Sequence, residues 1–226
     1  MDPARSRVFD GLTAAERGQW IEAARPREVR RNELVAHQGD QVREFALVES
    51  GLLKLVQLTP GGHELIVRFV GPGDPFGVVA LLDTARYPMT AVAVERTRLL
   101  VWTDGVLRPL LDRFPRVRLN VTRELAAYMT DALTRVRELT TERVSQRLAH
   151  TLLRLMRQVG TPHGDGVLIA HPLTRQELAD LTGTTLYTVS RTLSRWQSRG
   201  ILQSTRRHLL VRAPGRLEAL THQDDQ

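Results

Sequence analysis

The chain has 226 residues, of which 42% are hydrophobic, and its formal net charge is +7. This length and composition suit two folded domains, and no apolar run is long enough for a membrane helix or a signal core, so we expect a cytoplasmic protein with no membrane partner. Because the chain contains no cysteine, disulfides, thiolate zinc sites and cysteine-ligated iron–sulfur clusters are excluded.

Residues 29–101 read as a series of short strands. Apolar segments with alternating polarity, such as Phe45–Val48 and Gly51–Leu58, are separated by turns rich in glycine, proline and polar residues. Alternation with closely spaced turns predicts an antiparallel sandwich or roll, preceded by a short helix near Thr13–Ala24. We assign residues 1–112 to this β-rich domain.

A long helix follows, which we place at residues 113–140. Five apolar positions in it are spaced 4, 3, 4 and 7 residues apart, as in a coiled-coil heptad. They are Val121, Leu125, Tyr128, Ala132 and Leu139. A helix of about 25 residues is too long for one small β domain to cover, so we predict that this seam pairs with the same helix of a second subunit. The alternative is burial of the seam within its own chain.

Residues 141–226 form the last domain in our prediction, joined to the long helix by a hinge near Thr140–Arg143. An amphipathic helix is predicted at 142–159, and a short strand follows a glycine-rich loop at 160–166. Positive charge is concentrated here, because residues 143–226 contain 12 arginines and six acidic residues, whereas the rest of the chain is nearly balanced. A basic domain of this kind indicates a polyanionic partner.

The segment after this strand has the pattern of a helix-turn-helix. Thr174 and Glu177 form a capping-box pattern at the start of a short helix, and Gly183 permits a tight turn. Thr184 or Thr185 then caps a second helix. The residues expected to face the core of the two helices are Leu178, Leu181, Val189, Leu193 and Trp196.

The outer face of this motif carries the side chains that we expect to contact DNA. The second helix of a helix-turn-helix presents its N-terminal residues to the major groove, where polar groups contact phosphates and base edges. Residues 200–212 are predicted to form a hairpin, or wing, with a basic tip. The contact residues predicted from this pattern are Thr184, Thr185, Tyr187, Thr188, Ser190, Arg191, Arg195, Arg206 and Arg207.

Three features occur together: the turn Gly71–Gly77, the long helix and the segment Leu173–Leu202. With them the chain resembles, over essentially its whole length, the cyclic-AMP receptor protein/FNR (CRP/FNR) family of bacterial transcription factors. The resemblance implies an α+β fold with an N-terminal cyclic-nucleotide-binding-type β-roll (a double-stranded β-helix), a long dimerisation helix and a C-terminal winged helix-turn-helix. It also implies a homodimer that binds a two-fold symmetric operator in double-stranded DNA.

The resemblance implies roles for single residues. Arg191 matches the arginine that reads a guanine, and Ser190 matches the serine of the FNR branch. Positions that contact phosphate in the family match Arg175, Gln176, Thr185 and Thr188. The resemblance thus adds Thr174, Arg175 and Gln176 to the predicted DNA contacts. Tyr187 departs from the pattern, because most members have a glutamate there that accepts a hydrogen bond from cytosine. We therefore expect the half-site to differ at that base pair.

The effector site departs from the family's cyclic-AMP pattern. Members that bind the nucleotide hold its ribose with a Gly-Glu pair and its phosphate with an Arg-Ser/Thr-Ala run, and here these places read Gly77-Val78 and Met89-Thr90-Ala91. Burial of a phosphate without an arginine partner is costly, so we predict that cyclic AMP is not bound in the usual manner. The expected pocket residues are Phe76, Gly77, Val78, Leu81, Met89, Thr90, Ala91, Tyr128 and Ala132.

Other functions were weighed against this interpretation. His37 or His63 could ligate haem or a metal, but both lie in turn-like segments without the spaced companions of a metal-dependent β-barrel enzyme, so we predict no metal and no catalysis. A cyclic-nucleotide-binding regulatory subunit would keep the nucleotide motifs and lack the winged helix. The loop Thr161–Asp165 matches the place where family activators contact RNA polymerase, which makes the polymerase a candidate partner. The effector, the operator and the direction of regulation stay open.

Overall fold

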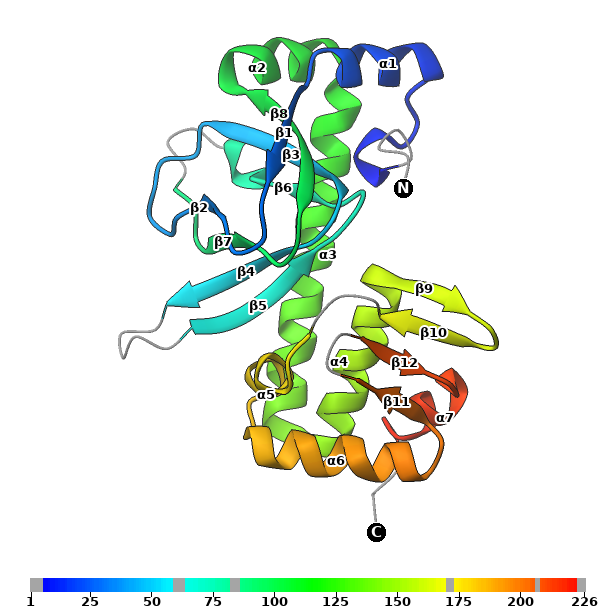
Figure 1. The fold of residues 1–226 in the computed structure, drawn as a ribbon. Helices are drawn as coiled ribbons and strands as arrows, with labels where there is room; N and C mark the ends of the chain where they lie inside the picture. The colour runs from blue at the N-terminus through cyan, green and yellow to red at the C-terminus, as the bar shows by residue number, and fades with distance from the viewer. Residues whose placement is uncertain (1–5, 59–63, 82–85, 170–172, 206–207, 223–226) are drawn as a thin grey trace. The chain divides into compact units, whose positions relative to one another are not determined.

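The structure is a computed structural model that describes residues 6–58, 64–81, 86–169, 173–205 and 208–222. The chain divides into two compact units, residues 1–131 and 132–226. One helix, α3 (Pro115–Thr141), begins in the first unit and ends in the second (Figure 1). Among the helices of these described ranges, none has the length and apolar character needed to cross a membrane.

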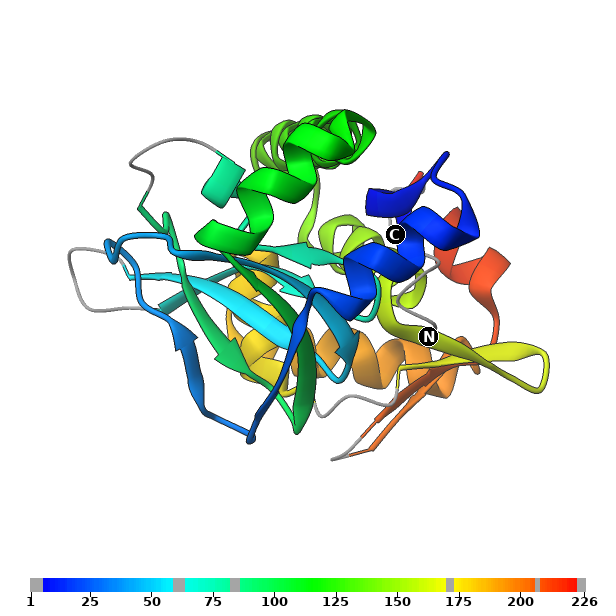
Figure 2. The same cartoon turned by 90° about the horizontal axis from the view of Figure 1, so that it is seen from above.

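The first unit contains a β-roll of two four-stranded antiparallel sheets (Figures 1 and 2). Its strands are β1 (Arg25–Val29), β2 (Leu34–Ala36), β3 (Glu44–Ser50), β4 (Leu53–Leu58), β5 (Glu64–Val70), β6 (Pro75–Phe76), β7 (Thr90–Ala93) and β8 (Thr97–Thr103). The strand orders are β1-β8-β3-β6 and β2-β7-β4-β5, so strands far apart in sequence pair with each other. The predicted N-terminal β-roll is confirmed.

Helical segments accompany the roll. They are η2 (Arg7–Phe9), α1 (Ala14–Glu22), η3 (Val78–Leu81) and α2 (Asp104–Arg113). The predicted lead-in helix is α1, which begins with a capping box between Thr13 and Glu16. The sequence patterns do not predict α2, because Pro109 lies inside it and proline usually ends a helix. α1 and α2 lie at the same end of the roll (Figures 1 and 2).

Aromatic side chains form the centre of one core of this unit. The ring centroid of Trp102 lies 5.8 Å from that of Trp20 and 5.6 Å from that of Phe45, at the inclined angles that aromatic pairs favour. Phe9 and Phe114 also pack against the Trp20 ring. Trp102 Nε1 donates a hydrogen bond to the carbonyl oxygen of Trp20 at 2.8 Å, which joins β8 to α1.

The first turns of α3 belong to this aromatic core. Val117 and Val121 are 1% and 2% exposed within it. Between them lies Asn120, whose buried Nδ2 donates to the carbonyl oxygens of Val8 and Asp10 at 3.0 and 2.9 Å. The predicted dimer seam begins at Val121, and the structure places this residue inside the core of its own unit. Val121 is therefore buried within its own chain and does not form part of an exposed seam.

A different apolar stripe of α3 is left exposed. We call it the α3 stripe; it consists of Leu119, Ala126, Met129, Leu133 and Val136, of which the four larger residues are 50 to 66% exposed. Its members follow heptad-like spacing, and it lies about 100° around the helix from the predicted seam, because each residue turns an α-helix by about that angle. Of the other seam residues, Leu125 and Leu139 are exposed, and Tyr128 and Ala132 are half-buried.

The second unit has the predicted winged helix-turn-helix architecture. Its elements are α4 (Val144–Val159), β9 (Gly160–His163), β10 (Gly166–Ile169), α5 (Arg175–Thr182), α6 (Leu186–Ser198), β11 (Leu202–Ser204), β12 (Leu209–Val211) and α7 (Pro214–Ala219). The strands form one sheet in the order β11-β12-β10-β9. The loop expected at 160–166 is instead the β9–β10 hairpin. The mostly exposed edge strand β9 lacks the alternation that identifies strands, and α7 is likewise not predicted.

A buried ion pair holds the last turn of α3 against α4. Arg154 Nη1 lies 2.7 and 2.9 Å from the two carboxylate oxygens of Glu138, and the two side chains are only 13% and 3% exposed. His150 Nε2 lies 3.4 Å from Glu142 Oε2, and Arg137 Nη2 lies 3.3 Å from Glu142 Oε1. A carboxylate buried as deeply as Glu138 needs a partner, because an isolated buried charge is very costly.

Replacing Arg154 by methionine should destabilise the second unit by about 3–5 kcal/mol, because the Glu138 carboxylate would stay buried without its partner. Amide hydrogen exchange of α4 in the full-length chain measures this as faster exchange. The double variant Glu138→Leu/Arg154→Met removes both charges and should recover much of the loss. Exchange in Arg154→Met that matches the wild type would contradict a structural role for the pair.

Candidate nucleic-acid interface

The first helix of the helix-turn-helix, α5, begins as its sequence predicts. The backbone N–H of Glu177 donates to Thr174 Oγ1 at 3.1 Å, and the N–H of Thr174 donates to Glu177 Oε2 at 2.9 Å. This reciprocal capping box satisfies backbone donors that the first turn of a helix leaves open. Leu178 and Ala179 of α5 are buried, whereas Leu181 is only half-buried.

The turn between the helices depends on Gly183. Its φ is +59°, a left-handed conformation that favours glycine, and a Cβ at this position would lie 2.9 Å from Leu139 Cδ2. Arg147 of α4 fixes the same turn, because its Nε donates to the carbonyl oxygen of Thr182 at 2.9 Å and its Nη1 donates to that of Glu142 at 2.7 Å. One arginine therefore connects the α3–α4 break to the turn.

The second helix, α6, separates a buried face from an exposed one. Thr185 is the residue that caps it, since Thr185 Oγ1 accepts a hydrogen bond from the N–H of Thr188 at 3.2 Å. Val189, Leu193 and Trp196 are at most 1% exposed and attach the helix to its unit, as predicted. The opposite face is therefore held out rigidly toward solvent.

Most of the predicted DNA-contacting residues lie at the surface of the second unit. Thr174, Arg175, Gln176, Thr185, Tyr187, Arg191 and Arg195 are exposed, and Thr184, Thr188 and Ser190 are half-buried. Gln176 Nε2 donates to Asp180 Oδ1 at 2.8 Å, within its own helix. Arg206 and Arg207 lie outside the described residues. The hairpin on which they were predicted is present, closed by Thr205 N–H donating to the carbonyl oxygen of His208 at 3.0 Å.

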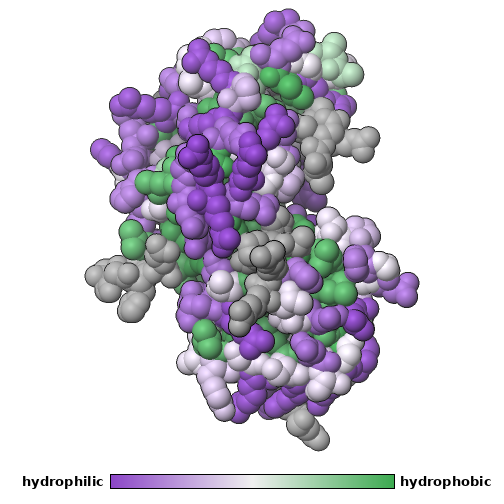
Figure 3. Space-filling view, viewed as in Figure 1, coloured by the Kyte–Doolittle hydropathy of each residue, from purple (hydrophilic) through white to green (hydrophobic). Residues whose placement is uncertain are grey.

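The part of this surface formed by α6 and the wing carries only positive charge. Residues 181–217 contain seven arginines and no acidic residue, so no carboxylate of α6 or the wing would repel a phosphate backbone. The lower edge of the molecule in Figure 3, where α6 lies, is mostly hydrophilic. Arg191 packs on Tyr187 four residues earlier, with its guanidinium carbon 5.8 Å from the ring centroid.

One exposed large apolar residue of α6 is missing from the predicted contacts. Leu186 occupies the first position of the helix and is 48% exposed. In the sequence it falls on the same apolar stripe as Val189, Leu193 and Trp196, so periodicity assigns it to the core. The core ends before this turn, and only the structure shows that Leu186 faces solvent.

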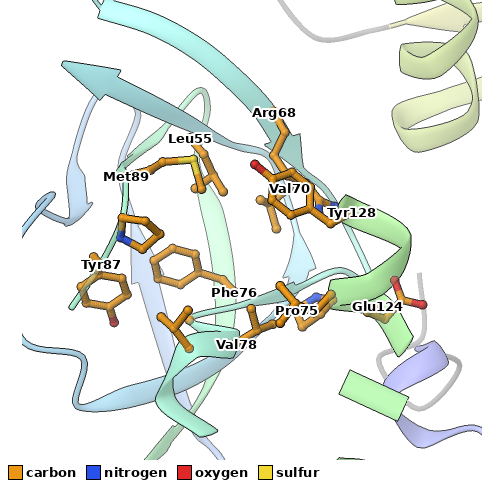
Figure 4. Close-up of a pocket in the computed structure, with 14 residues that line it drawn as sticks. Leu55, Arg68, Val70, Pro75, Phe76, Val78, Tyr87, Met89, Glu124 and Tyr128 are labelled. Carbon is orange, nitrogen blue, oxygen red and sulfur yellow. The ribbon is translucent and has the colours of Figure 1, made fainter. Parts of the chain in front are cut away.

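The first unit contains a cavity of about 110 Å³ in the β-roll, bordered by α3 (Figure 4). Of the predicted pocket residues, Phe76, Gly77, Val78, Met89 and Tyr128 line it. Leu81, Thr90, Ala91 and Ala132 do not. Thr90 and Ala91 are buried instead in the strand packing, where Thr90 Oγ1 accepts a hydrogen bond from the N–H of Gln38 at 3.1 Å. Gly77 is required, because at φ +70° a Cβ would lie 2.6 Å from the carbonyl oxygen of Glu44.

The cavity also has lining residues that the sequence does not predict. The lining residues that were not predicted are Leu55, Arg68, Val70, Pro75, Val79, Tyr87, Pro88, Glu124 and Leu125. Arg68 brings a guanidinium to the wall, with its carbon 5.2 Å from the ring centroid of Tyr128 (Figure 4). Glu124 adds a carboxylate from α3. These residues come from β5 and α3, far from the Gly77 and Met89 segments, so no local motif identifies them.

Burial controls the ionisation of two groups near this cavity. Tyr87 stacks on Phe76 with ring centroids 5.5 Å apart, and burial, together with the Glu44 charge, raises the pKa of Tyr87 to about 12. Burial also raises the pKa of Asp74, although the Gly71 N–H at 3.0 Å and the Arg68 guanidinium at 3.8 Å both favour its charged form. Arg68 therefore already has a carboxylate partner.

The histidines considered as haem or metal ligands do not form a site in the described part of the chain. His37 is exposed in a turn, with Nδ1 2.8 Å from the carbonyl oxygen of Gln38. His63 lies outside the described residues. Within the described ranges, no group of three His, Asp or Glu side chains could hold a metal ion.

Comparison with known families gives two matches in the chain. The cyclic nucleotide-binding domain family matches residues 26–114, and the Crp-like helix-turn-helix domain family matches residues 146–220. The Cyclic AMP receptor protein of Thermus thermophilus is 33% identical over 198 residues, which cover 88% of each chain. A CRP-like cAMP-activated global transcriptional regulator of Mycobacterium tuberculosis is 25% identical over 214 residues, or 95% of this chain and 96% of that one.

Solved structures share the fold over the same extent. FixK2 from Bradyrhizobium japonicum is similar with a TM-score of 0.77 at 24% identity, covering 89% of this chain and 99% of that chain. The Catabolite Activator Protein of Thermus thermophilus is similar with a TM-score of 0.56 at 31% identity, covering 96% of this chain and 99% of that chain. Both the β-roll and the winged helix-turn-helix therefore have counterparts in known proteins.

Proposed function

Because the chain belongs to the CRP/FNR family of DNA-binding transcription regulators, we propose that it is a homodimer that binds a two-fold symmetric operator through α6 and responds to a ligand other than cyclic AMP. The relatives are transcription regulators, and the proposal gives the chain no catalytic activity. The observation that carries the proposal is the exposed, acid-free face of α6 with Arg191 at its centre.

We assign recognition of the DNA sequence to α6 because one of its faces anchors the helix in the core and the other is exposed. Val189, Leu193 and Trp196 anchor the helix, so its N-terminal half can enter a major groove without losing its position. Arg191 is the side chain suited to a guanine, because a guanidinium pairs with the O6 and N7 atoms of that base. Arg175 and Thr174, at the start of α5, are assigned to phosphate.

Dimerisation is assigned to the α3 stripe. Its four large apolar residues are exposed, whereas apolar surface of this extent on one helix is usually covered by a partner. The spacing of the α3 stripe suits a parallel pair of identical helices. The same helix reaches the core of the first unit through Val117 and that of the second through Glu138, so it can carry the state of the β-roll toward the helix-turn-helix. We assign RNA polymerase contact to the exposed β9–β10 turn.

A ligand other than cyclic AMP is supported by the cavity walls. Val78 and Met89 stand at the places of the ribose and phosphate partners, and neither carries a charge. Arg68 already faces Asp74, and the Glu124 carboxylate would repel a cyclic phosphate. A small, largely apolar ligand suits the Phe76–Tyr87 stack better.

The operator is first obtained by selecting bound sequences from a random DNA pool with the full-length protein. Replacing Arg191 by alanine should then weaken binding to this operator by about 1–3 kcal/mol and relax discrimination at one base pair per half-site, because the bidentate contact to guanine is lost. Arg157→Ala removes the same charge from the exposed face of α4 and should leave discrimination unchanged. An Arg191→Ala protein as selective as the wild type would show that α6 does not read the operator.

Replacing Met129 by aspartate should convert the dimer into monomers, because two facing carboxylates would replace apolar contacts at the centre of the α3 stripe. Light scattering at several protein concentrations measures the mass. Ala127→Asp is the matched control, since Ala127 is exposed on the opposite side of α3 and should leave the mass unchanged. A Met129→Asp dimer would place the subunit interface elsewhere.

Calorimetric titration of cyclic AMP into the wild-type protein should give no saturable binding below about 1 mM, because the cavity offers no unpaired cation to the phosphate. Met89→Arg adds a guanidinium at the position of the family arginine and should bind more tightly than the wild type. Stoichiometric binding to the wild type that is lost in Val78→Asp would instead make cyclic AMP a ligand of this cavity.

A further inference from the structure

We propose that Leu186 and Tyr187 read the C5-methyl group of thymine, so that each half-site contains a T·A pair recognised by apolar contact in addition to the guanine read by Arg191. This inference rests on the proposed function, because it requires α6 to lie in the major groove. The inference names thymine as the base at the position where the family pattern leads us to expect cytosine.

The first observation is an exposed apolar pair in a polar surface. Leu186 and Tyr187 are the first two residues of α6 and are 48% and 71% exposed. Apart from Leu133, Val136 and Leu139 on α3, they are the only large hydrophobic residues exposed among the described residues of the second unit. Their position at the N-terminal end of the helix is where a recognition helix meets base edges.

The second observation is that the neighbouring hydroxyl groups are already engaged. Thr185 Oγ1 accepts from the N–H of Thr188 at 3.2 Å and lies 3.0 Å from Thr188 Oγ1. Both side chains therefore already take part in hydrogen bonds within the cap of α6. What the first turn offers freely to a base edge is the apolar surface of Leu186 and Tyr187.

The major groove contains one apolar group that such a surface can recognise. Thymine presents its C5-methyl group there, whereas the other edges present hydrogen-bond donors and acceptors. A cytosine in the same place would direct its N4 donor toward a leucine and the face of an aromatic ring, which lack the charged acceptor that a glutamate would offer. Apolar contact therefore favours thymine over cytosine at this base pair.

The third observation concerns Arg191. The Tyr187 ring lies beside its guanidinium, with 5.8 Å between the guanidinium carbon and the ring centroid, and Arg191 makes no ion pair with any described residue. A glutamate at 187 would pair with Arg191 across one helical turn and accept from cytosine. Tyr187 instead supports the guanidinium through its ring and leaves its charge available for guanine.

The test uses the full-length dimer and the operator selected from a random pool. Each thymine is replaced in turn by deoxyuridine, which removes only the C5-methyl group and keeps the base pair. At one position of each half-site this should weaken binding about 4-fold, or about 15-fold when both half-sites are changed, as expected for loss of one buried methyl each. Substituting cytosine there should weaken binding further, and 5-methylcytosine should regain part of the loss.

Substitutions of Leu186 and Tyr187 test whether these two residues cause the effect of the thymine methyl group. Leu186→Ala and Tyr187→Ala should bind thymine and deoxyuridine operators with more nearly equal affinity, whereas Tyr187→Phe should keep the wild-type difference because it keeps the ring. Tyr187→Glu should prefer cytosine at the same position and ignore its methylation. Arg195→Ala is the control, because it should weaken binding to the thymine and deoxyuridine operators by the same factor.

The outcomes separate this inference from the proposed function. A wild-type protein that selects an operator but binds every deoxyuridine version equally well would overturn methyl reading and leave α6 as the DNA reader. A methyl effect that survives unchanged in both alanine variants would overturn the assignment to Leu186 and Tyr187. Failure to select any sequence would overturn both proposals.

Discussion

The buried pair between Glu138 and Arg154 is the interaction on which the geometry of the second unit depends. It attaches the last turn of α3 to α4 at 2.7 Å, and Arg147 of α4 then bonds the carbonyl oxygen of Thr182, at the end of α5. From there Gly183 sets the turn into α6. Two arginines of α4 thus connect the end of the long helix and the turn before the proposed reading helix, and the Glu138–Arg154 pair resists displacement because a buried charge cannot lose its partner cheaply.

The surface of α6 combines two kinds of recognition. Seven arginines without a carboxylate between residues 181 and 217 supply an attraction to DNA that does not depend on sequence. Specificity has to come from groups that distinguish base edges, and the exposed candidates are Arg191 together with the apolar pair Leu186 and Tyr187. The cation–π contact joins the polar and the apolar part of this face, which gives Tyr187 a role in both.

The β-roll has the architecture of a cyclic-nucleotide-binding domain around a cavity that is mostly apolar and also contains Arg68 and Glu124. The glycine that the strand turn requires is present at Gly77, while the lining residues Val78 and Met89 carry no charge. Arg68 enters the cavity from another strand and is balanced by Asp74 rather than left for a phosphate. The fold therefore does not by itself fix the ligand, because strand packing and cavity lining depend on different residues.

Local patterns in the sequence by themselves determined the cap of α5, the glycine turn at Gly183 and the buried face of α6, because each depends on residues within a few positions of one another. For α6 they left two candidate caps, Thr184 and Thr185, and the structure decided for Thr185. The α+β fold class came from the resemblance to the CRP/FNR family, which three segments of the sequence carry together. Tertiary structure decided which stripe of α3 is buried, since two apolar stripes about 100° apart both fit the helical period and only the packing of Val121 on the aromatic core distinguishes them. It likewise decided the exposure of Leu186, where the core ends, and the entry of Arg68 and Glu124 into the cavity, because these contacts join segments far apart in the chain.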